Sequence, residues 1–119
     1  MIPVEKLDVY KLSENLADLI WSDFDLWDEK VRRTIGYQII RSADRISANI
    51  SEGFGRFTPK DRAKFYLYAR SFEETKAWLR KLIRRKILSQ TQINEYEKLI
   101  NEIGPKLNAF ITKTRGMPE

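Results

Sequence analysis

The sequence of 119 residues contains no cysteine and no histidine. Without cysteine, the chain forms neither a disulfide nor a thiolate metal site. Without histidine, it lacks the commonest general base, the commonest metal ligand and the usual switch near neutral pH. We therefore expect a non-enzymatic protein without a cofactor or a metal. An enzyme built on converging carboxylates, with or without Mg²⁺, is the weakest of the alternatives that stay open.

Glycine, proline and long apolar runs are scarce as well. Five glycines and four prolines argue against a fold of strands and tight turns. No apolar run approaches the roughly 20 residues that span a bilayer, and the N-terminal residues lack the apolar stretch of a signal peptide. We expect a cytoplasmic protein that does not associate with membranes. With 42% hydrophobic and 12% aromatic residues, the chain has enough apolar side chains for a single domain over residues 1–119.

Charge is present in abundance but is unevenly placed. The chain carries a formal net charge of +5. Residues 1–30 hold 3 basic and 8 acidic side chains, whereas residues 31–90 hold 15 basic and 5 acidic ones. Such asymmetry is typical of a basic face that attracts a polyanion, or of one that meets the acidic face of another subunit. A solvated face of an ordinary helical protein is the third interpretation.

Apolar residues recur at helical spacing in four segments, over about residues 7–22, 28–52, 58–87 and from 89 onward. In the last segment, Ile93, Tyr96 and Ile100 begin a stripe with alternating steps of three and four residues. Ser89 followed by Gln92 has the pattern of a capping box, which begins a helix. In the third segment, Thr75 stands within the apolar seam. Short connectors between long helices predict an all-α protein, an antiparallel up-down-up-down four-helix bundle.

The strongest local signal is basic. Six cations and no acid lie between residues 76 and 86, a density that suits phosphate contacts but demands no exact spacing. Trp78 lies among them, where it either packs in the core or an interface or stacks on a base. In the second segment, Arg41 and Arg45 present two guanidinium groups to phosphates or to carboxylates. The candidate nucleic-acid contacts are Arg41, Arg45, Arg56, Lys76, Arg80, Lys81, Arg84 and Arg85.

A second group of residues is predicted to have a structural role rather than to contact nucleic acid. Polar side chains of the second segment recur in steps of three and four residues and therefore share one stripe. The glycines after it resemble a phosphate-binding loop only weakly, because no strand precedes them and no Lys-Ser/Thr pair follows. The candidate structural motif comprises Gln38, Asn49, Glu52, Gly53, Arg70, Ser71 and Glu74.

These residues carry a family resemblance. The sequence resembles the 23S ribosomal RNA intervening-sequence four-helix bundle proteins in three stretches, namely Gln38-Ile39-Ile40-Arg41, Ala48-Asn49-Ile50-Ser51-Glu52-Gly53-Phe54-Gly55-Arg56 and Phe65-Tyr66-Leu67-Tyr68-Ala69-Arg70-Ser71-Phe72-Glu73-Glu74. Weaker similarity extends to residues 7–10 and 106–111. The chain departs from the family in lacking a proline at Ser47 and in carrying Arg45, which predicts a straighter and more basic second helix.

The resemblance implies a four-helix bundle that assembles into a ring, with five subunits as the expected number. It also implies a relation to the accessory variability protein of diversity-generating retroelements, which works with a reverse transcriptase and nucleic acid. Two hypotheses follow for this chain. The first is a ring-forming accessory protein that binds RNA or DNA. The second is a protein–protein adaptor without nucleic acid, in which acidic helix 1 of one subunit neutralises basic helix 3 of the next.

Overall fold

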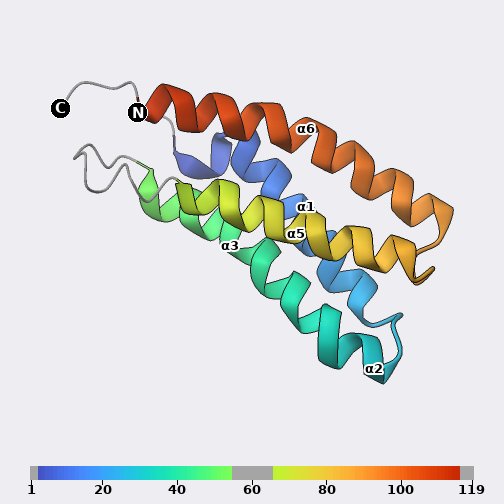
Figure 1. Cartoon of the computed structure of the whole chain (residues 1–119). Coiled ribbons are helices and arrows are strands. Elements are labelled where there is room, and N and C mark those ends of the chain that lie inside the picture. The colour runs from blue at the N-terminus through green and yellow to red at the C-terminus, as the bar shows by residue number, and fades with distance from the viewer. Residues whose placement is uncertain (1–2, 55–65, 116–119) are drawn as a thin grey trace.

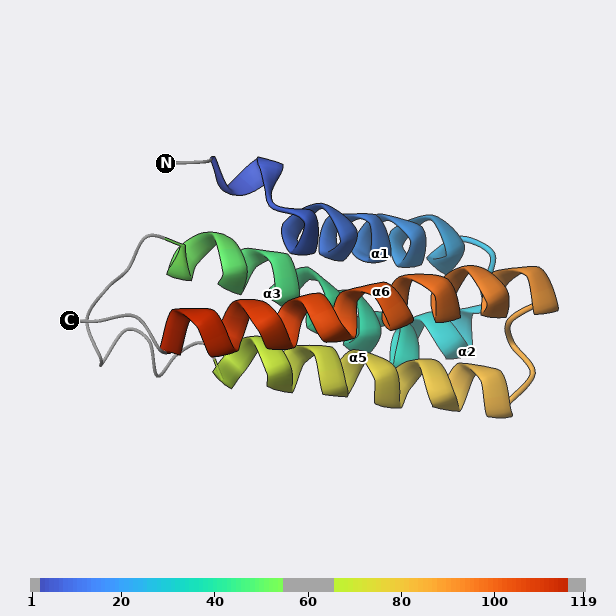
Figure 2. The same ribbon diagram turned by 90° about the horizontal axis from the view of Figure 1, so that it is seen from above.

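The computed structural model describes residues 3–54 and 66–115, which contain helices and no strand. Successive long helices run in opposite directions (Figures 1 and 2), and they build an elongated bundle of 48 × 23 × 21 Å. The predicted four-helix bundle is confirmed. The helices in chain order are η1 (Val4–Lys6), α1 (Asp8–Phe24), α2 (Glu29–Val31), η2 (Arg32–Gly36), α3 (Tyr37–Gly53), α5 (Tyr66–Arg84) and α6 (Gln90–Arg115).

The second bundle helix is continuous from α2 through η2 into α3, and η2 is a π-helical turn. It begins at Asp28, whose side chain accepts a hydrogen bond from the Val31 backbone N–H at 3.0 Å. It ends at Gly53, one residue after the expected end at residue 52. Ser47 lies buried inside α3, which continues through this position without a break. The sequence periodicity did not predict the π-turn.

The ends of α5 and α6 show how local chemistry sets helix limits. The Ser89 backbone N–H donates to Gln92 Oε1 at 2.7 Å, and the Gln92 backbone N–H donates to Ser89 Oγ at 3.2 Å, so the predicted capping box is confirmed. Helix α5 ends at Arg84, earlier than the expected end near residue 87, because Lys86 takes the left-handed conformation with φ 58°. The predicted start at residue 58 lies outside the described residues.

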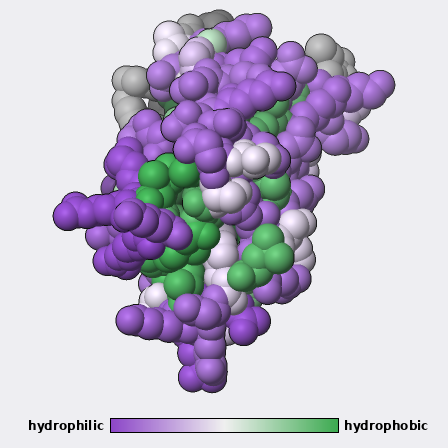
Figure 3. All heavy atoms as spheres, turned by 90° about the vertical axis from the view of Figure 1, so that its right-hand side faces the viewer, coloured by the Kyte–Doolittle hydropathy of each residue, from purple (hydrophilic) through white to green (hydrophobic). Residues whose placement is uncertain are grey.

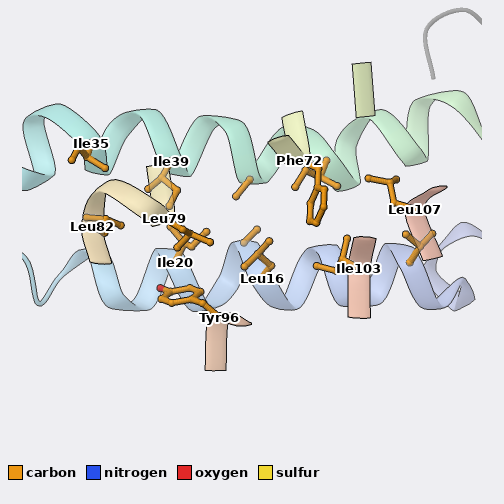
Figure 4. Packing of buried hydrophobic residues seen from close by; sticks show 14 of the residues in the cluster. Leu16, Ile20, Ile35, Ile39, Phe72, Leu79, Leu82, Tyr96, Ile103 and Leu107 are labelled. Atoms are coloured by element: carbon orange, nitrogen blue, oxygen red, sulfur yellow. The ribbon is translucent and has the colours of Figure 1, made fainter. Parts of the chain in front are cut away.

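The core lies where the apolar stripes of α1, α3, α5 and α6 meet. Leu16, Ile20 and Ile39 are fully buried, and Figure 4 shows them pointing between α1 and α3. Burying one such side chain completely contributes roughly 1.5–3 kcal/mol relative to leaving it exposed. Within the described residues, no helix is both long enough and apolar enough to cross a membrane.

Two buried polar contacts fix how the helices are aligned. Between α3 and α5, the Thr75 hydroxyl lies 2.9 Å from the Ser42 hydroxyl and 2.8 Å from the Ser71 carbonyl oxygen. Between α1 and α6, the Tyr96 hydroxyl donates to Asp23 Oδ2 at 2.6 Å. Burial, reinforced by the hydrogen bond to Asp23, raises the pKa of Tyr96 far above its ordinary value, so the phenol stays protonated.

We expect Tyr96→Phe to lower the free energy of unfolding by about 1–3 kcal/mol, because it leaves the buried Asp23 carboxylate without this donor. Urea unfolding followed by circular dichroism measures the change. Tyr37→Phe is the matched control, since it removes the hydroxyl of a tyrosine that is 51% exposed and should change stability by less than about 0.5 kcal/mol. Equal losses in both variants would contradict the assigned role of the Tyr96–Asp23 contact.

Candidate nucleic-acid interface

A basic groove runs between α3 and α5. Its volume is about 670 Å³, and its lining contains four cations and no carboxylate. We call it the α3/α5 groove. Its lining residues are Arg33, Thr34, Ile35, Tyr37, Gln38, Arg41, Trp78, Lys81 and Arg85. The structure therefore brings three of the predicted contacts, Arg41, Lys81 and Arg85, together across two helices.

The two walls of the groove follow from helix geometry. Trp78 and Lys81 on α5 and Arg85 directly after it are separated by three and four residues and so share one face. On the other wall, Arg33 and Arg41 are eight residues apart. In an uninterrupted α-helix, eight residues overshoot two full turns by about 80°. The π-turn over Arg32–Gly36 takes up about one extra residue, and Arg33 therefore lines the same groove as Arg41.

The basic surface continues from the groove over the outer side of α5. There a second hollow of about 510 Å³ is lined by Ala77, Arg80, Lys81, Arg84 and Arg85. All four of these cations are exposed. No ion pair within the described residues joins any of them to a carboxylate. Their charges are therefore available to an anionic ligand.

The remaining predicted contacts lie elsewhere. Lys76 faces α6 rather than α3: it pairs with Glu73 at 2.8 Å, lies 5.0 Å from the centre of the Phe72 ring, and lines a smaller hollow with Tyr96. Arg45 is exposed on α3 but lines none of these hollows. Arg56 lies outside the described residues.

The candidate structural motif is dispersed over the bundle. Gln38 lines the α3/α5 groove, and the Ser71 carbonyl oxygen accepts a hydrogen bond from Thr75. Asn49 and Glu74 are half-buried, Gly53 is buried at the end of α3, and Glu52 and Arg70 are exposed. Within the described part of the chain, no ion pair joins Arg70 to Glu74, although they stand four residues apart on α5.

Three carboxylates gather where α1 meets α3. Helices α1 and α5 lie on opposite sides of the bundle (Figure 2). Desolvation, and then the nearby charges of Glu14 and Asp18 on α1, raise the pKa of Asp44 on α3 above its ordinary value. These three carboxylates form the acidic cluster. The chain thus presents negative charge where α1 meets α3 and positive charge where α3 meets α5.

Large apolar side chains are open to solvent near the end of α1. Trp21 is 66% exposed, and Leu26, in the connector to α2, is 73% exposed. Figure 3 views the end of the bundle that holds the α1–α2 and α5–α6 connectors, and it shows hydrophobic areas between hydrophilic ones. Large apolar side chains that stay in solvent are compatible with a surface that meets another protein.

Three features of the site were not predicted. Arg33 and Tyr37 were not among the candidate residues. The sequence also did not predict that Lys76 lies on the side of α5 that faces α6. The signal for Arg33 is faint, because a regular α-helical period places it away from Arg41. For Tyr37, an aromatic residue outside the apolar stripe of its helix is the only indication in the sequence.

Comparison with known proteins identifies the family to which the sequence is similar. A family model described as 23S rRNA-intervening sequence protein matches residues 5–109. The match covers nearly the whole chain and confirms the resemblance that the motifs of the second and third helices indicated. No curated protein matches the chain significantly.

Gly36 lies at the π-turn that positions Arg33, and we expect Gly36→Ala to destabilise the protein by about 1–3 kcal/mol. A methyl group there would lie 2.8 Å from Phe24 Cε2 and 3.1 Å from the Val31 carbonyl oxygen. This crowding outweighs the preference of about 1 kcal/mol that alanine has over glycine in a helix. Urea unfolding measures the change.

Gly104→Ala is the matched control for this substitution. Its nearest neighbour would be Phe72 Cε2 at 3.6 Å, an ordinary contact. The gain in helix preference is opposed by crowding against the following proline, so a change within about 0.5 kcal/mol is expected. A Gly36→Ala protein as stable as the wild type would mean that the π-turn does not need glycine.

Proposed function

The chain belongs to the 23S rRNA-intervening sequence protein family, and from this premise we propose that it is a non-enzymatic, ring-forming protein that binds nucleic acid or acts as its accessory. The observation that carries the proposal is the pair of hollows on α3 and α5, which are lined by exposed cations and by no carboxylate. Phosphate groups need such a surface, and arginine is the side chain best shaped to bind them.

The binding mechanism is electrostatic. Each lysine or arginine that approaches a phosphate releases counterions from the nucleic acid, which gives affinity without dependence on base sequence. Arg80, Lys81, Arg84 and Arg85 form a continuous row of such contacts along α5. In a ring of five copies, a net charge of +5 per chain becomes about +25, and weak contacts made by each copy add together.

Assembly into a ring is part of the proposal, with five copies as the number that the family resemblance implies. Two observations support self-association. Trp21 and Leu26 leave large apolar side chains in solvent. The acidic cluster lies where α1 meets α3, on a different face of the bundle from the basic surface, so that one copy can present negative charge to the positive charge of the next.

The proposed partners are RNA or DNA, together with a reverse transcriptase or another protein that the ring assists in the cytoplasm. The chain's own contribution is to hold the polyanion, because cations line the two hollows on α3 and α5. No membrane partner is proposed.

A protein–protein adaptor is the second candidate, and the acidic cluster favours it. Desolvation, and then the nearby charges of Glu14 and Asp18, raise the pKa of Asp44. If this cluster of one copy neutralised α5 of the next, the basic surface would serve assembly and would be closed to nucleic acid. The two candidates therefore differ in what reversal of the α5 charges does to the oligomer.

We expect Arg80→Glu combined with Arg84→Glu to weaken nucleic-acid binding by about tenfold or more at low salt. The slope of log affinity against log salt concentration should fall by roughly 2, because two phosphate contacts are lost. Fluorescence anisotropy with labelled RNA and DNA over a range of salt concentrations measures both quantities.

The matched control is Lys98→Glu combined with Lys113→Glu, which makes the same change of net charge at two exposed lysines of α6. This control should keep most of the affinity and the salt slope. Equal losses in the two double variants would show that net charge alone governs binding. Light scattering completes the test: dissociation of the oligomer by the α5 reversal would favour the adaptor.

A further inference from the structure

The α3/α5 groove contains an exposed aromatic ring beside its cations. Tyr37 lines the groove and is 51% exposed. Its ring lies against Phe24, with ring centres 5.7 Å apart and planes at 31°. Phe24 in turn makes an edge contact with Trp27, which is 5% exposed. The ring of Tyr37 is therefore anchored on the core through Phe24 while half of the side chain stays in solvent.

We infer that the α3/α5 groove binds single-stranded nucleic acid, with a base stacked on Tyr37 and the neighbouring phosphates held by Arg41, Lys81 and Arg85. This inference rests on the proposed function and adds the class of polynucleotide and the place where it binds. A base has an apolar π-face that an aromatic side chain covers whatever the base is, and flanking cations follow the backbone. The groove supplies both elements within one lining.

The form of the site favours a single strand over a duplex. In a duplex, the base faces are stacked on one another, and only base edges and the backbone are offered to a protein. Tyr37 would then have no base face to cover. The groove is also a hollow between two packed helices, not a projecting helix of the kind that enters a major groove.

Gln38 adds a polar group to the same lining. An amide both donates and accepts hydrogen bonds, and unstacked bases offer their edges to such groups. Gln38 and Tyr37 are adjacent at the start of α3, directly after the π-turn. The turn that brings Arg33 into the groove therefore lies next to the residues that would contact a base.

The test compares a single strand with a duplex. Anisotropy is measured for labelled oligouridine and oligothymidine of about 12 nucleotides, and for a duplex of the same length. Tyr37→Leu keeps an apolar side chain against Phe24 but removes the flat ring. It should weaken single-strand binding by about fivefold or more, and duplex binding by less than about twofold. Tyr10→Leu, the same substitution at a half-buried tyrosine of α1 outside the groove, should leave both affinities unchanged.

Contact is measured separately from affinity. Oligonucleotides carrying 5-iodouridine or its deoxy form are irradiated with the unmodified full-length chain, and the crosslinked peptide is identified by mass spectrometry. Crosslinks on Tyr37 or Trp78 are expected. Circular dichroism of Tyr37→Leu confirms that the helices persist; if it did not fold, the crosslink position in the wild type would still decide the question.

The outcomes separate the inference from the proposed function. Equal affinity for single strand and duplex, with no effect of Tyr37→Leu, would overturn the inference and leave electrostatic nucleic-acid binding standing. Crosslinks confined to α6 would also overturn it. No binding of any nucleic acid at low salt would refute the proposed function and the inference together. Loss of the oligomer on Arg41→Glu or Lys81→Glu would show that the groove is an interface between copies.

Discussion

Each helix of this bundle has only one stripe that can be buried, and the rest of the structure depends on this constraint. In α3, Ile39, Ala43, Ile46 and Ile50 recur at steps of three and four residues and are fully buried. Matching stripes on α1, α5 and α6 close around them (Figure 4). A charged side chain cannot enter such a core without a large desolvation cost. The cations of α3 and α5 are therefore confined to the outer faces of these helices.

The order in which the helices pack then determines which of their outer faces lie side by side. Because α3 packs beside α5, the cations beside the buried stripe of one helix border those of the other, and the α3/α5 groove results. The hydroxyl contact between Ser42 and Thr75 fixes the alignment of these two helices in an otherwise apolar seam. On the far side, the contact between Tyr96 and Asp23 does the same for α1 and α6. A buried polar contact favours one alignment because sliding the helices would leave its atoms unpaired.

The resulting molecule has two faces of opposite charge on one narrow bundle. The acidic cluster lies where α1 meets α3, and the cations gather on α3 and α5. Long-range electrostatic attraction brings either a polyanion or a second copy of the chain to such a surface, and it does not distinguish between them. Distinguishing between them requires a contact that acts at short range. The ring of Tyr37, supported by Phe24 and open on the groove, is the feature of this kind that the described residues offer.

The sequence by itself determined the helices, because backbone hydrogen bonding sets a period that apolar spacing and capping residues reveal locally. The bundle, the box formed by Ser89 and Gln92, and the buried place of Thr75 were all predictable in this way. Only the tertiary structure decided that Arg41 and Lys81 line the same groove and that Lys76 lies on the side of α5 that faces α6. Both depend on how each helix is rotated about its axis relative to its neighbours. That rotation is set by how the whole buried face of each helix packs against its neighbours. At the π-turn, one extra residue in the turn also changes the rotation.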